Sequence, residues 1–179
     1  MSKTWKSILA IALLTVIAVL FFRYHEAART PLGDAPVLTF PHSGIPSSAE
    51  RQFLASDFTI IKDVKALPRP VLQAFTEEGG SRFTLANPGK KFLVTDEIDD
   101  SSLPRKRLIF AAISGEKCFV HYEQGGIAHS FVLAFFRVTS NDKMEPVWRS
   151  YCGPAADIQD LRSQVLKGDC AHPLPQGMR

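Results

Sequence analysis

The residue types most capable of chemistry lie together in residues 116–131, which read EKCFVHYEQGGIAHSF. This stretch contains Cys118, His121, Glu123 and His129. Imidazole and carboxylate groups could bind zinc or act as general acid and base, and a thiol near an imidazole could act as a nucleophile. Whether any of this chemistry is available depends on the elements that position the four side chains.

Strand alternation separates the thiol from the imidazole. Residues 117–124 are predicted to form a strand, in which successive side chains point to opposite faces of the sheet. His121 and Glu123 then share one face, and Cys118 lies on the other. We therefore interpret Cys118 as a small buried apolar residue, and we assign no catalytic residue.

The position of His129 depends on the loop at Gly125-Gly126, a preferred pair for a two-residue hairpin turn. With that turn, His129 lies on the face away from His121 and Glu123, whereas a three-residue loop would bring all three side chains together. We favour the two-residue turn, with His121 toward solvent, because it gathers an apolar set on one face, namely Val120, Tyr122, Phe131, Leu133 and Phe135. His121, Glu123 and His129 remain candidate binding residues, and no metal site or cofactor is predicted.

Near the start of the chain, residues 8–22 carry no charge and include one polar residue, Thr15. The run is somewhat shorter than the ~20 helical residues that a bilayer core about 30 Å thick requires. Lys6 and Arg23 flank it and can extend their charges to the two membrane surfaces. We predict a single-pass membrane anchor with a cytoplasmic N-terminus, so that the rest of the chain lies outside the cytoplasm.

A cleaved signal peptide is the alternative interpretation of this segment. Its cleavage site needs small residues at the positions before the cut. A cut after Ala27 places His25 at the −3 position, and a cut after Ala28 places Glu26 there. Neither residue is small, which favours an anchor that stays in the mature protein.

The charge of the 179-residue chain is +3, and the excess lies at its start. Residues 1–29 hold Lys3, Lys6, Arg23 and Arg29 against Glu26, so the remaining residues carry equal numbers of basic and acidic side chains. A nucleic-acid binder would show a basic surface that matches the phosphate charge. We therefore predict no nucleic-acid partner.

Prolines at 31, 36, 41 and 46 make residues 30–46 a predicted spacer between the anchor, residues 1–29, and a domain at residues 47–179. The domain should contain helices near 47–56, after Pro70 and over 158–167. Between the last two, the sequence predicts strands at 82–85, 91–97, 107–114, 117–124, 128–139 and 145–151.

This order of elements predicts an α+β fold, in which two or three helices pack on one face of an antiparallel sheet of about five or six strands. The other face should be partly open. By analogy of element order alone, a cystatin-like domain would fit this description. No family is recognised from the residues themselves.

Three cysteines in an exported domain allow one disulfide and leave one thiol. Cys152 and Cys170 bracket the last predicted helix, and closing such a loop would stabilise the fold by about 3 kcal/mol. The alternatives are a Cys118–Cys152 bond and free thiols. We favour Cys152–Cys170.

Two functions are compatible with these patterns. The first is a membrane-anchored extracytoplasmic domain that binds an envelope protein through its open sheet face or a charged loop, without catalysis. The second is a small-ligand-binding or hydrolytic domain with a site in the concavity of the sheet around His121, Glu123 and His129.

Overall fold

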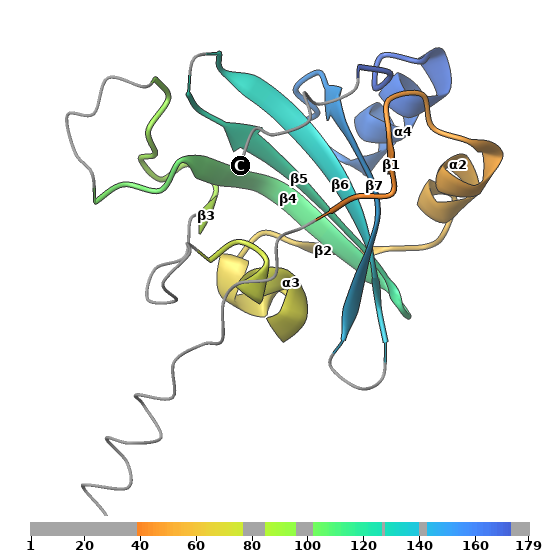
Figure 1. The fold of residues 1–179 in the computed structure, drawn as a ribbon, viewed down its shortest axis with the longest axis horizontal. Coiled ribbons are helices and arrows are strands. Elements are labelled where there is room, and N and C mark those ends of the chain that lie inside the picture. The colour runs from red at the N-terminus through yellow and green to blue at the C-terminus, as the bar shows by residue number, and fades with distance from the viewer. Residues whose placement is uncertain (1–38, 77–84, 96–101, 127, 140–142, 173–179) are drawn as a thin grey trace, which may run out of the picture. The chain divides into compact units, whose positions relative to one another are not determined.

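The computed structural model describes residues 39–76, 85–95, 102–126, 128–139 and 143–172 (Figure 1). They belong to a compact unit that spans residues 34–179. The predicted membrane segment, 8–22, lies outside the described residues. Within the described ranges, no helix is long and apolar enough to cross a membrane.

The described part is an α+β fold built on one mixed, seven-stranded sheet, which confirms the predicted fold class. The strand order is β1-β7-β6-β5-β4-β2, with β3 beside β4. The bounds are β1 (His42–Ser43), β2 (Thr59–Ile61), β3 (Leu85–Ala86), β4 (Lys106–Ser114), β5 (Lys117–Gln124), β6 (Ser130–Val138) and β7 (Met144–Cys152).

The prediction of an antiparallel sheet holds for β4 to β7, which are joined by short connections. It is wrong for the whole sheet, because β1 pairs parallel to β7 and β3 pairs parallel to β4. Both parallel strands are two residues long; β1 lies in the expected spacer, and β3 begins at residue 85, where the strand predicted at 82–85 was to end. Each pairs with the strand beside which its segment runs, β1 with β7 and β3 with β4.

Both faces of the sheet are covered. Helices α2 (Ser48–Leu54) and α4 (Ile158–Lys167) pack on one face, while the 3-10 turn η1 (Val64–Ala66) and α3 (Arg69–Gln73) pack on the other (Figure 1). The expectation of a partly open face is therefore wrong. Strand β5 shows why, since its six residues from 118 to 123 are all buried. Strands buried on both faces lose the alternation that marks an exposed side.

The ends of α2 and α4 follow from local sequence signals. Ser47 and Glu50 form a capping box at the start of α2, in which the Ser47 backbone N–H donates to Glu50 Oε2 at 2.7 Å. Asp157 caps α4, and Gly168 ends it with a φ of 85°. These helices confirm the prediction, whereas α3 is shorter than expected and residues 91–95 form only an isolated bridge, between Thr95 and Gly126.

The folded part begins before Ser47, within the segment expected to be a spacer. The Phe40 ring lies 5.6 Å from the Phe136 ring, and the Trp148 indole N–H donates to the Gly44 carbonyl at 3.2 Å. Between these contacts, β1 pairs with β7. Residues 42–43 are therefore part of the sheet, and Phe40 packs against its core.

The Cys152–Cys170 disulfide is present, with the two Cα atoms 4.3 Å apart, as predicted. Residues 153–157 connect β7 to α4, and the chain after α4 brings Cys170 back beside Cys152 at the end of β7. Gln164, on α4, binds the segment that connects β7 to α4. Its side chain accepts from the Gly153 N–H at 3.0 Å and donates to the Pro154 carbonyl at 2.8 Å.

Candidate functional site

The β5–β6 hairpin has a different register from the one expected. Glu123 pairs with Phe131 and Gln124 with Ser130, which leaves residues 125–129 as the loop. The two-residue turn at Gly125-Gly126 is therefore wrong, and His129 lies on the same side as Glu123. The apolar set predicted for one face is divided, because Leu133 and Phe135 face α2 and α4 while Val120 and Tyr122 face α3.

The glycine pair serves a contact with another segment. A Cβ on Gly125 would lie 1.8 Å from the Leu93 carbonyl oxygen, so only glycine fits there. The Gly126 N–H donates to the Val94 carbonyl at 3.2 Å. Residues 93–95 therefore cross directly over this end of the hairpin.

Glu123 is the centre of a polar cluster at this end of the sheet. Arg107, on β4, binds both carboxylate oxygens of Glu123, with Nε and Nη2 each 2.9 Å from one oxygen. His129 Nε2 lies 2.9 Å from Oε2. The Arg107 guanidinium also lies over the Phe92 ring, 4.5 Å from its centroid. This arrangement joins β4, the hairpin loop and the crossing segment.

His121 shares this face of the sheet but is buried in the core. Its Nδ1 lies 3.1 Å from the Val132 carbonyl oxygen, while its Nε2 is buried and has no hydrogen-bond partner. Desolvation by burial lowers the pKa of His121 to about 4. The expectation that His121 faces solvent is therefore wrong, because α4 and the rest of that core cover its face.

The cluster provides little capacity for chemistry. Both oxygens of Glu123 are bound to Arg107, and the side chain is only 12% exposed. Cys118 is a free buried thiol, as predicted, and burial raises its pKa to about 12, which disfavours a nucleophilic thiolate. No group of three or more His, Cys, Asp or Glu side chains within the described residues is placed to bind a metal ion. Ligand binding by His121, Glu123 and His129 stays a prediction.

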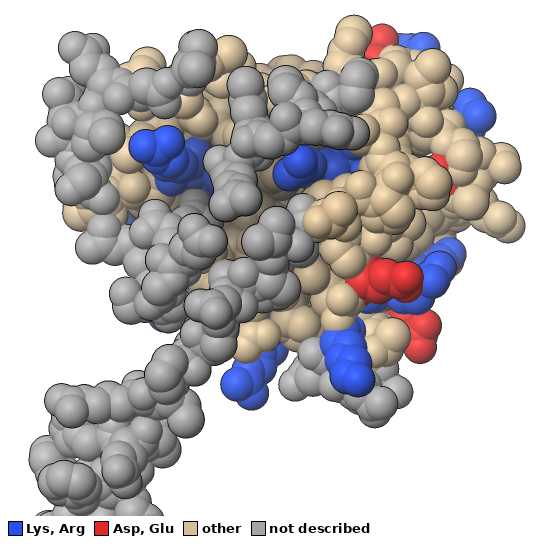
Figure 2. Space-filling view, viewed as in Figure 1, with Lys and Arg blue, Asp and Glu red and all other residues tan. Residues whose placement is uncertain are grey.

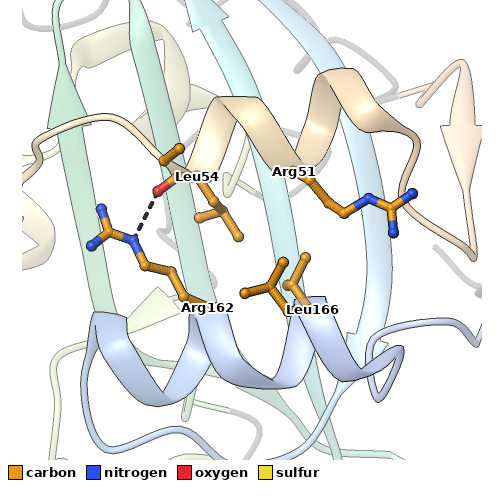
Figure 3. A pocket seen from close by; sticks show the side chains of 6 residues that line it. Arg51, Leu54, Arg162 and Leu166 are labelled. Atoms are coloured by element: carbon orange, nitrogen blue, oxygen red, sulfur yellow. Dashed lines mark hydrogen bonds between the residues drawn. The ribbon is translucent and has the colours of Figure 1, made fainter.

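A second feature is a half-open hollow of about 130 Å³ between α2 and α4 (Figure 3). Leu54 and Val165 are buried, each 2% exposed, whereas Leu166 is 71% exposed. Figure 3 shows the Leu54 and Leu166 side chains pointing toward one another between the helices. The six lining residues are Arg51, Leu54, Ala55, Arg162, Val165 and Leu166. We call this feature the α2–α4 hollow.

Arg162 closes one end of the α2–α4 hollow by binding the C-terminal end of α2. Its Nε donates to the Leu54 carbonyl at 2.9 Å and its Nη2 to the Ser56 carbonyl at 2.7 Å. These carbonyls lack partners within the helix, and the helix dipole favours a cation beside them. Arg51 lies toward the other end and is exposed.

Sequence reasoning did not identify the hollow or Arg107. Leu166 is an apolar residue that lies at the solvent edge of its helix. A usable signal for Arg107 was its place in the basic run 105–107 on a strand adjacent to that of Glu123. No comparable signal links α2 to α4, which are about a hundred residues apart in the chain.

Charges on the face viewed in Figure 2 are mixed rather than gathered. Acidic and basic side chains lie near each other at its lower right, and further basic side chains lie apart from them. Comparison of the chain with protein-family models, with curated proteins and with solved structures finds no match.

Proposed function

We propose that this protein is an extracytoplasmic binding domain, tethered to a membrane by residues 8–22, which docks an envelope protein in the α2–α4 hollow. Two features support the location. Residues 8–22 form an uncharged run, apolar except for Thr15, between basic flanks. The Cys152–Cys170 disulfide is typical of an oxidising compartment outside the cytoplasm.

The observation that carries the binding function is the α2–α4 hollow itself. It combines buried aliphatic side chains with the exposed Leu166. At about 130 Å³ it is smaller than the roughly 300–1,000 Å³ that small-molecule and cofactor sites occupy. A hollow of this size suits a side chain of a partner protein, which makes a binding domain without a cofactor the better interpretation.

The hydrolytic or small-ligand function around His121, Glu123 and His129 has less support. It required a concave, open sheet face, and helices cover both faces in the described part of the protein. Glu123 is bound by Arg107 and His129, and His121 is buried beneath. The analogy with cystatin-like domains concerns element order and suggests no partner.

Site-specific crosslinking tests the proposed function. The full chain would carry the photoreactive residue benzoylphenylalanine in place of Leu166, in its native membranes. A matched chain would carry it in place of Arg69, which is exposed on α3 at the opposite face of the sheet. We expect irradiation to yield a discrete adduct from position 166 and none from position 69. No adduct at 166, or the same adducts at both positions, would contradict the proposal.

A further inference from the structure

We propose that the segment entering the α2–α4 hollow is an acidic linear peptide, in which one aliphatic side chain is flanked by carboxylates. This inference rests on the proposed function and adds the chemistry of the partner. It follows from the size of the hollow, the charges at its ends and their arrangement around the apolar side chains.

The size of the hollow limits what can occupy it. At about 130 Å³, the hollow is well below the roughly 300–1,000 Å³ of a small-molecule site and suits one side chain. Leu54 and Val165 are buried aliphatic neighbours for such a group, and Leu166 can cover it from the solvent side. The occupant is therefore a single aliphatic side chain held by its own backbone.

Both charged residues that line the hollow are arginines. The ion pairs of the described residues are Arg107–Glu123, His129–Glu123 and Arg137–Glu145, so neither Arg51 nor Arg162 has a carboxylate partner there. Glu50, the acidic residue next to Arg51, is used in the capping box of α2. Arg162 already binds carbonyls at the C-terminal end of α2 through Nε and Nη2, so a ligand can complement the exposed Arg51 and the remaining Nη1 of Arg162.

The arginines lie at opposite ends, with Leu54 and Leu166 between them (Figure 3). A chain that inserts an aliphatic side chain at the middle would place its neighbouring residues near both guanidinium groups. Carboxylates on both sides of the inserted residue match this arrangement, because guanidinium groups bind carboxylates in preference to neutral groups. Basic residues at the same places would be repelled.

The test uses two fluorescein-labelled peptides, Gly-Ser-Glu-Ser-Leu-Ser-Glu-Ser-Gly and the same sequence with lysine in place of both glutamates. Each is titrated with the full chain in zwitterionic nanodiscs, and binding is followed by fluorescence anisotropy, with empty nanodiscs as the blank. We expect the acidic peptide to bind about tenfold more tightly than the basic one at low salt. Raising sodium chloride to 0.5 M should reduce this difference, because the charges are exposed.

Three variants locate the site. Arg51→Glu should weaken binding of the acidic peptide about fivefold to tenfold and strengthen binding of the basic peptide. Arg69→Glu, the same charge change on α3, should leave both unchanged. Leu166→Asp should weaken the acidic peptide at least as much as Arg51→Glu does. Because Arg51, Arg69 and Leu166 are exposed, all three variants should fold.

The outcomes separate this inference from the proposed function. Equal binding of the two peptides, or equal effects of Arg51→Glu and Arg69→Glu, would overturn the acidic partner. If crosslinking at position 166 still captures a protein, the proposed function stands with a partner of different chemistry. If crosslinking at that position fails as well, both proposals are wrong.

Discussion

Replacement of His121 by glutamine should remove a large part of the acid sensitivity of this protein. His121 is fully buried, and Nδ1 lies 3.1 Å from the Val132 carbonyl oxygen, so Nδ1 carries the hydrogen. The neutral ring then leaves Nε2 as an unpaired acceptor in the core. Protonation would place a charge there, which is why desolvation lowers the pKa from 6.5 to about 4.

The sign and size of the effect follow from this shift. Between pH 6.5 and 4 the unfolded chain binds a proton at His121 that the folded protein does not, so stability falls as the pH falls. Above pH 6.5 both states are neutral at this site and the effect vanishes. From pH 7.5 to pH 4.5 the loss amounts to about 2–3 kcal/mol. Glutamine does not titrate, and its amide can still donate to a carbonyl.

Urea unfolding of the full chain, followed by tryptophan fluorescence, measures this difference, because Trp148 is buried with 1% exposure. We expect the free energy of unfolding to fall between pH 7.5 and 4.5 by about 2–3 kcal/mol more in the unmodified protein than in His121→Gln. His129→Gln keeps the buried imidazole and should retain the loss. Parallel pH profiles of the unmodified protein and His121→Gln, within about 0.5 kcal/mol, would refute the reasoning.

Three further changes should alter stability in urea unfolding. Phe135→Ala removes a fully buried ring that stacks on an aromatic ring of α2 at 4.7 Å, and should cost about 3–5 kcal/mol; a cost below 1.5 kcal/mol would contradict this packing. Joint replacement of Cys152 and Cys170 by serine should cost about 3 kcal/mol, because the disulfide closes a loop with a sequence separation of 18; equal unfolding with and without reductant would contradict it. Gly125→Ala should cost at least about 2 kcal/mol more than Gly115→Ala, since a Cβ at 125 meets backbone at 1.8 Å and one at 115 meets nothing within 4 Å; similar costs would show that the crossing segment can move away.

The sequence by itself determined the local elements and where the long ones end. The capping box at Ser47 and Glu50 starts α2, and Asp157 and Gly168 bound α4. Strands β4 to β7 were predicted within one or two residues, because turn-forming residues separate β-rich runs. The disulfide was predicted from an expected compartment outside the cytoplasm and from the two cysteines that bracket one helix. Each of these signals acts over short distances along the chain.

Tertiary structure decided the register and the composition of the sites. A register can be inferred from alternation only where one face is exposed, and both faces of β5 and β6 are buried over most of their length. The glycine pair, which suggested a tight turn, instead accommodates Leu93 and Val94 from another segment. The α2–α4 hollow likewise exists only because two distant helices pack on the same face of the sheet.

The Arg107–Glu123 ion pair shows most clearly which features the sequence determined and which the tertiary structure decided. The turn between β4 and β5 pairs Ser114 with Lys117, and counting back from it would place Glu123 opposite Leu108. A register shift between Leu108 and Phe110 moves the pairing by one residue and places Arg107 opposite Glu123. Such a bulge adds one residue to one strand and changes which side chains meet beyond it. Its position depends on how the whole sheet packs, so the sequence predicted the two strands and the tertiary structure decided the ion pair between them.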